Sequence, residues 1–202
     1  MRKRLLYLCI LFTCTLLTAQ EQFENKTFGF WMDMPAGWIE GSNEELALNL
    51  EKLEIDDYKL SKIIRDHKGS VLLLSLYKYD PETHTGLIPA IQINVRERNN
   101  EDFEEFKDDI TASAKRFDKL YENFNFIDEP ENVKISRIKS IYFATKFTMH
   151  TDNGQTHRVR SRIYVIPYKH YYFQVNMTDN LMGEDCGKEF SGLIKSVKIK
   201  RK

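Results

Sequence analysis

Basic and aromatic side chains alternate along the stretch from residue 141 to residue 177, and they could bind an anion or an acidic protein. Arginine offers a planar fork of donors that fits a carboxylate, and tyrosine offers a flat contact surface. The even-numbered face would carry Tyr142, Lys146, Arg158, Arg160, Arg162, Tyr164 and Tyr172. The same alternation is typical of any sheet with one solvated face, where long basic stems lie over tyrosine rings. Both interpretations, a partner-binding face and a solvated face, stay open.

Histidine and cysteine give no comparable signal for catalysis or metal binding. His150 and His157 lie near one predicted hairpin tip but point to opposite faces in the expected register, so we expect no metal site. Cys186 lies on an apolar helical stripe, which favours an inert core thiol. The chain has no Gly-x-Ser-x-Gly elbow, His-Glu-x-x-His motif or glycine-rich phosphate loop. We therefore expect no catalytic residue, no metal and no cofactor. A hydrolase of unrecognised type would need a cleft of polar groups with perturbed pKa values.

The first nineteen residues predict a secretory signal peptide. Arg2-Lys3-Arg4 forms a basic start, Leu5 to Leu17 is an apolar core too short to span a bilayer, and Ala19 offers a small residue for cleavage. The alternative is an uncleaved anchor, but the polar sequence after Ala19 does not match a stop-transfer pattern. We expect an exported protein, periplasmic or extracellular, with one domain from residue 20 to residue 202 and no transmembrane segment after cleavage.

Removal of the signal changes the charge and the cysteine count of the chain. It leaves 27 basic residues against 30 acidic ones, a balance that argues against a nucleic-acid partner. Cys9 and Cys14 leave with the signal, so Cys186 alone remains and no intramolecular disulfide can form. Cys14 does not fit a lipoprotein signal, because bulky Phe12 and branched Thr13 occupy positions where small residues are usual.

The parity of the apolar residues predicts a three-stranded antiparallel meander between Ile141 and Met177. Apolar residues fall on odd positions in all three runs, which is the period of a half-buried strand. A two-residue Asn-Gly turn in the first connection would set odd positions opposite even ones. A three-residue loop, Asp152-Asn153-Gly154, pairs Thr151 with Gln155 and keeps the parity.

The remaining elements form a mixed pattern of helices and strands. The longest helix carries an aromatic face that needs a sheet to cover. The run from Val71 to Leu76 lacks alternation, which is typical of a central strand covered on both faces. In chain order we expect a strand at 28–34 that ends in the Pro35-Ala36-Gly37-Trp38 turn, helices from Ser42 through Leu53 and at 56–67, strands at 71–76 and 91–95, the long helix at 101–124, a short strand at 133–138, and a closing helix and strand at 186–199.

This order of elements, with the early Pro35-x-x-Trp38 turn, the long helix, the meander and the closing helix, resembles the PsbP-like fold. The family includes the lumenal extrinsic protein of photosystem II, exported bacterial relatives and a Ran-binding nuclear-import factor. The resemblance implies an α+β fold, an α/β/α sandwich with a central antiparallel sheet, a C-terminal meander and helices on both faces. It also implies a non-enzymatic role, and no functional residue is carried over from it.

We therefore expect an exported accessory module of the bacterial envelope that contacts a protein partner through a sheet face, with the even-numbered face as the candidate. The alternative is a carrier of a small anionic or lipidic ligand. Its pocket would lie between the long helix and the sheet and would be lined by Phe103, Phe106 and Phe117.

Overall fold

The computed structural model describes residues 21–41, 62, 64–66, 69–99, 101–151 and 154–200. The predicted signal peptide and the helix predicted from Ser42 lie outside these residues. Of the helix predicted at 56–67, Lys62 and residues 64–66 are helical, and Ile64 is buried. Gly69, at a φ of +78°, donates its amide to the Ile64 carbonyl at 2.8 Å. Among the described residues, no helix is both long and apolar enough to cross a membrane.

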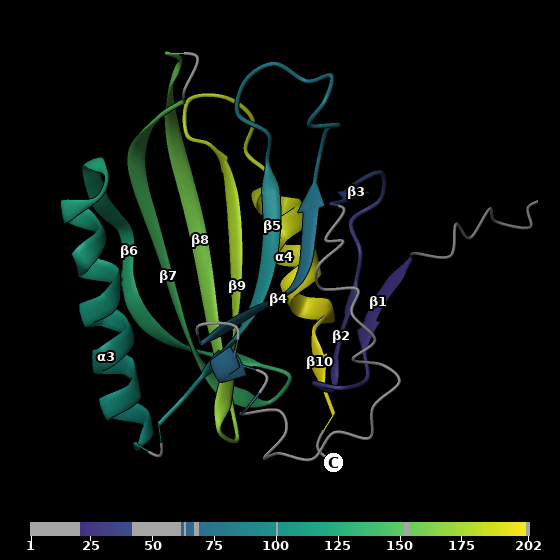
Figure 1. Cartoon of the computed structure of the whole chain (residues 1–202), viewed down its shortest axis with the longest axis vertical. Helices are drawn as coiled ribbons and strands as arrows, with labels where there is room; N and C mark the ends of the chain where they lie inside the picture. Colours follow the sequence, from purple (N-terminus) through teal and green to yellow (C-terminus); the bar gives the residue numbers. More distant parts are fainter. Residues whose placement is uncertain are drawn as a thin grey trace, which may run out of the picture.

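Seven described strands form one antiparallel sheet in the order β3-β4-β5-β9-β8-β7-β6 (Figure 1). Strands β7, β8 and β9 follow one another in sequence and pair as neighbours, so they are the predicted three-stranded meander. The bounds of the seven described strands are β3 Ile39–Glu40, β4 Ser70–Tyr77, β5 Ala90–Glu97, β6 Glu122–Ile135, β7 Ile138–His150, β8 Thr156–Tyr168 and β9 Tyr171–Asn180.

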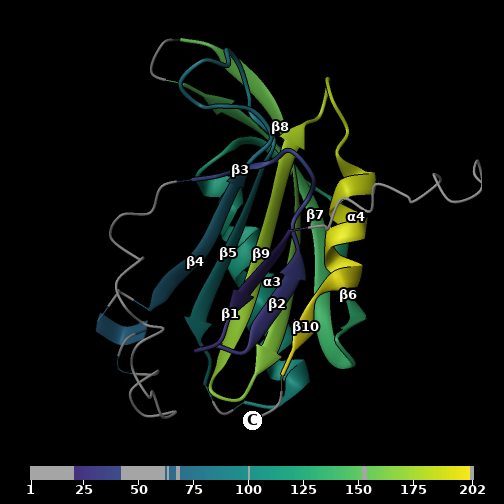
Figure 2. The same ribbon diagram turned by 90° about the vertical axis from the view of Figure 1, so that its right-hand side faces the viewer.

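Helices cover both faces of this sheet, as predicted (Figures 1 and 2). On one face lies α3, Phe103–Lys115, which continues into a short 3-10 helix, η2, Arg116–Lys119. On the other lies α4, Gly187–Ser196, beside a small sheet with the order β1-β2-β10. The bounds of its strands are β1 Gln22–Asn25, β2 Phe30–Asp33 and β10 Lys198–Ile199. The α+β fold class is therefore confirmed.

The two layers enclose separate hydrophobic cores. The larger core lies between the sheet, α4 and the small sheet, and it contains Phe30, Phe173 and Phe190. Trp38 belongs to this core, with its ring centroid 6.0 Å from that of Phe190, so it anchors the predicted turn. The smaller core lies under α3 and consists of Phe106, Ala114, Ile141, Phe143, Ile163 and Val165.

The predicted register of the β7–β8 hairpin is confirmed. The Thr151 amide donates to the Gln155 carbonyl at 2.9 Å, and Phe147 pairs with Val159. Gly154 has a φ of +80°, a left-handed conformation that glycine adopts without steric cost. The loop is one residue longer than a two-residue Asn-Gly turn, and this extra residue keeps the buried side chains of both strands on one face.

The long helix is shorter than the aromatic spacing predicted. It ends at Lys115, and Phe124 lies in β6 rather than in a helix. The aromatic spacing was misleading because Phe124 and Phe126 also fit the two-residue period of a strand. Pairing with β7, which runs along the whole of β6 through several bulges, makes this segment a strand. The short strand predicted at 133–138 is the end of this strand and the start of β7. Pro130 fits because β6 is an edge strand.

Candidate functional site

Six of the seven residues of the predicted binding face lie on one side of the sheet. Strands β7 and β8 pair Tyr142 with Tyr164, Lys146 with Arg160, and Thr148 with Arg158. Arg162 lies between them opposite Ala144, with its guanidinium 5.6 Å from the centre of the Phe190 ring. This side therefore faces α4 and the larger core.

Tyr172 does not belong to this face, and its placement there was wrong. Strands β8 and β9 are joined by a two-residue turn that sets Tyr168 opposite Tyr171, so even positions of β8 pair with odd positions of β9. Tyr172 therefore points to the opposite side of the sheet, where its ring lies 5.3 Å from that of Phe106. The odd residues of β9 share a face with the arginines of β8 instead.

Two of the arginines form an ion-pair network around one buried aspartate rather than an open platform. Asp179 is fully buried and accepts from Arg160 Nε at 2.8 Å and from Arg162 at 2.9 Å. Asp185 accepts from Arg162 at 2.9 Å and lies 3.1 Å from Arg160. The arginine side chains are only 15% and 16% exposed. Their donors are directed into the protein and are not available to a partner.

The network also fixes the start of α4. The Cys186 amide donates to Asp179 at 2.9 Å, and the Gly187 amide donates to Asp185 at 2.8 Å. Burial alone would lower the pKa of Arg162, but hydrogen bonds and charge from Asp179 and Asp185 raise it. The four side chains of this cluster, Arg160, Arg162, Asp179 and Asp185, thus balance their charges while they hold the helix against the sheet.

The remaining members of the predicted face are more accessible. Arg158 is exposed, and its guanidinium donates to the Met182 sulfur at 3.9 Å. The Tyr142 hydroxyl donates to Asp128 at 2.9 Å, and its ring lies 4.7 Å from that of Tyr164. Burial raises the pKa of both tyrosines, so both stay protonated. A partner could reach this half of the face through Lys146, Arg158 and Tyr142.

The structure gives the surroundings of Cys186 and of the two histidines near the hairpin tip. Burial raises the pKa of the Cys186 thiol to about 12, so the thiolate that would act as a nucleophile is not populated at neutral pH. His150 contacts Thr156 at 3.0 Å and Glu122 at 3.2 Å, and His157 pairs with Met149. Among the described residues, no three His, Cys, Asp or Glu side chains lie close enough to hold a metal ion.

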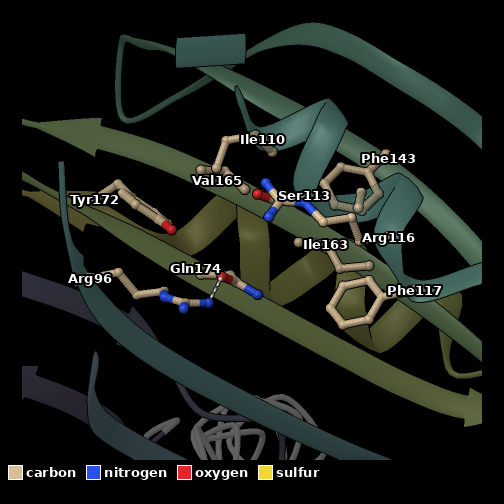
Figure 3. A pocket seen from close by; sticks show the side chains of 11 residues that line it. Arg96, Ile110, Ser113, Arg116, Phe117, Phe143, Ile163, Val165, Tyr172 and Gln174 are labelled. Atoms are coloured by element: carbon tan, nitrogen blue, oxygen red, sulfur yellow. Dashed lines mark hydrogen bonds between the residues drawn. The ribbon is translucent and has the colours of Figure 1, made fainter. Parts of the chain in front are cut away.

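A pocket of about 250 Å³ lies on the other side of the sheet, between its surface and the C-terminal half of α3 (Figure 3). It is the kind of pocket that the alternative function, a small-ligand carrier, requires. Its lining consists of Arg96, Ile110, Ser113, Ala114, Arg116, Phe117, Phe143, Ile163, Val165, Tyr172 and Gln174.

Of the three phenylalanines predicted to line a pocket, only Phe117 does. Phe106 fills the space nearer the start of α3, against Tyr172, and Phe103 lies under the Lys139 ammonium at 4.1 Å. Arg96 and Arg116 were missed. The sequence held a signal for each. Arg96 directly follows the strand predicted at 91–95, at a position that alternates with its apolar residues, and Arg116 directly precedes Phe117 in the predicted helix.

An exposed apolar surface adjoins the pocket at the end of α3. Phe117 is 41% exposed, Leu120 is 72% exposed and Tyr121 is 37% exposed. The rings of Phe124 and Phe147 extend it, because Phe117 lies 6.3 Å from Phe124 and Tyr121 lies 4.4 Å from Phe147. We call these five residues the helix-end patch. The sequence had placed the first four of them on the buried side of one long helix.

No protein-family model and no curated protein matches this sequence. Among solved structures, the cyanobacterial PsbP (CyanoP) of Synechocystis is similar, with a TM-score of 0.51 and 8% identity over 95% of this chain and 99% of that chain. The likeness shows the fold, so the predicted PsbP-like fold is confirmed.

Two further solved structures give lower scores. The Ran-binding protein Mog1p of Saccharomyces cerevisiae has a TM-score of 0.48 and 7% identity over 89% of this chain and 94% of that chain. A protein from Bacteroides thetaiotaomicron has a TM-score of 0.47 and 14% identity over 90% of this chain. The chain spans about half of the length of the Bacteroides protein, 48% of it.

Proposed function

We propose that this chain is an exported, non-catalytic accessory module that binds a protein partner through the helix-end patch. The observation that carries the proposal is the exposure of Phe117, Leu120 and Tyr121 together at one end of α3. Contiguous apolar side chains on the surface of a soluble domain are typical of an interaction site. Aromatic residues in particular are enriched at the centre of protein interfaces.

The surroundings of the patch indicate the chemistry of the partner. Lys115, Arg116 and Lys119 are exposed on the same short stretch of chain. No ion pair with a described carboxylate involves any of the three, so their charge is free to attract an acidic surface. We therefore expect the partner to present an apolar centre with an acidic rim.

The arrangement of the titratable groups supports a non-catalytic role. The two clusters of charge near α4 are internally paired, with Lys78 bound to Glu184 at 2.7 Å and to Glu189 at 2.8 Å. Cys186 beside them is a protonated thiol. Groups that neutralise each other in this way stabilise a helix end, and none of these four residues lines the pocket beneath α3.

Export follows from the predicted signal peptide at residues 1–19, which predicts that the module acts in the periplasm or outside the cell. The PsbP-like fold does not by itself imply a compartment or a function, because one fold can carry many functions. The partner is accordingly expected among proteins of the same compartment.

Site-specific photo-crosslinking in the source cells tests the proposal. A photoreactive phenylalanine analogue replaces Leu120 in one variant and Arg158 in a matched control, because both sites are exposed but lie on opposite sides of the sheet. We expect a single dominant protein adduct from position 120 and none from position 158. Adducts from position 158 alone would transfer the function to the arginine face, and adducts from neither would refute a protein partner at the patch.

A further inference from the structure

The pocket beneath α3 combines an apolar base with polar groups on two sides. Ile163 and Val165 of β8 form its base, and Ile110 and Phe117 of the helical segment bound it (Figure 3). Arg96, Tyr172 and Gln174 lie along the side formed by β5 and β9, and Ser113 and Arg116 lie across from them on the helical segment. Such a lining, apolar with a few polar groups, is typical of a small-molecule site.

The size of the side chains explains why the space is open. From α3 the pocket is lined by the small side chains of Ser113 and Ala114 together with Ile110, and the sheet below adds the branched aliphatic side chains of Ile163 and Val165. Larger aromatic side chains lie beside them, with Phe106 packed against Tyr172, and Phe117 and Phe143 also in the lining. Small helical side chains between larger ones thus leave space between α3 and the sheet.

Two cations at this pocket have no carboxylate partner among the described residues. Arg96 donates weakly to the Gln174 side-chain carbonyl at 3.4 Å, and Arg116 donates to the Ala112 carbonyl at 3.4 Å. Neither forms an ion pair with a carboxylate in the described part of the chain. This contrasts with Arg160 and Arg162 on the other face, which both pair with two aspartates. A guanidinium that is left without a counter-ion beside an apolar cavity favours an anionic ligand.

Tyr172 adds a neutral donor to the same side. Burial raises the pKa of its hydroxyl, so the group stays protonated and can donate to an anion. The Gln174 side chain is positioned by Arg96 and by Asn176, to which its amide donates at 2.9 Å.

We infer that this pocket binds a compact amphipathic carboxylate, with the carboxylate held by Arg96, Arg116 and Tyr172 and the apolar body resting on Ile163, Val165 and Phe117. The volume of about 250 Å³ limits the body to one ring or a short chain. The site goes beyond the proposed partner surface and is independent of it, although Phe117 lies at the border of both.

The test is an NMR titration of the mature chain with 3-phenylpropionate, compared with the uncharged 3-phenylpropanamide. We expect saturable shifts of the Ser113, Tyr172 and Gln174 amides with the acid and a Kd on the order of 1 mM or below, given what a ligand of this size gains per atom. Arg96→Gln and Arg116→Gln should each weaken binding of the acid by about tenfold, which is the effect of losing one charge-assisted hydrogen bond. Neither variant should change the affinity for the uncharged amide. Both arginines are exposed, so neither variant should unfold the protein.

Two further variants keep the outcomes distinct. Ser113→Trp, which fills the cavity from the helix, should abolish binding of both compounds, whereas Leu120→Asp in the helix-end patch should change neither. Equal binding of acid and amide, retained affinity in both glutamine variants, or an absence of saturable shifts would overturn the inference. Shifts confined to the patch and lost in Leu120→Asp would also overturn it, while they would leave the proposed partner surface intact.

Discussion

At the scale of single residues, Asp179 determines what the arginines of β8 do. The sequence showed the alternation of Arg158, Arg160 and Arg162 correctly, and the structure confirms that they share a face. It could not show that Asp179, nineteen positions after Arg160, would lie buried between two of them. Pairing of this kind depends on the register of β9 against β8. A two-residue turn sets this register, and the parity of the apolar residues did not indicate it.

Replacement of Asp179 should therefore be costly. Asp179→Ala leaves two guanidinium groups without their shared carboxylate and removes the acceptor of the Cys186 amide, so we expect the free energy of unfolding to fall by about 3–5 kcal/mol. Chemical denaturation measures this change. As a matched control, Arg158→Ala on the same face but outside the network should change stability by no more than about 0.5 kcal/mol. A small effect at Asp179 would show that the network is not a structural anchor.

At the scale of elements, the strands were more predictable than the end of the long helix. The β7–β8 hairpin follows from parity because a slip of one residue would expose every buried side chain on the strand. The region after Lys115 was not predictable in the same way, since Phe117, Leu120, Tyr121 and Phe124 fit a helical stripe. Pairing with β7 decides in favour of a strand from Glu122 onward, and this long-range contact is what leaves Leu120 exposed.

The start of α3 is defined by a local signal that can be tested. The Asp102 side chain caps the helix by accepting from the amides of Glu104 at 2.8 Å and Glu105 at 3.0 Å. We expect Asp102→Ala to lower the free energy of unfolding by about 1 kcal/mol, the usual effect of losing such a cap. Asp109→Ala, in the middle of the same helix, is the control for loss of charge and should not destabilise, because alanine has the higher helix propensity. Equal destabilisation by both would argue against the cap.

At the scale of the whole molecule, the two faces of the sheet have different roles. The face toward α4 contains the larger core and the saturated ion pairs, so its polar residues mainly hold the fold together. The face toward α3 contains the smaller core, the pocket and the helix-end patch. Lys139 pairs there with Glu104, but Arg96 and Arg116 at the pocket form no ion pair with a described carboxylate. The α+β class and the antiparallel sheet with helices on both sides could be predicted from the order of the elements. The division of roles could not, because it depends on which charges meet in space.

We expect the partner to bind at the end of α3 and not on the arginine face. The most direct measurement is the affinity of the partner identified by crosslinking for two variants, Leu120→Asp and Arg158→Ala, each checked by circular dichroism to be folded. We expect Leu120→Asp to weaken binding by about tenfold or more, because a charge placed in the apolar centre of an interface stays desolvated and unpaired. Arg158→Ala should leave the affinity within about twofold, as is usual outside a hot spot. The reverse order, with affinity lost at Arg158 and retained at Leu120, would contradict the account.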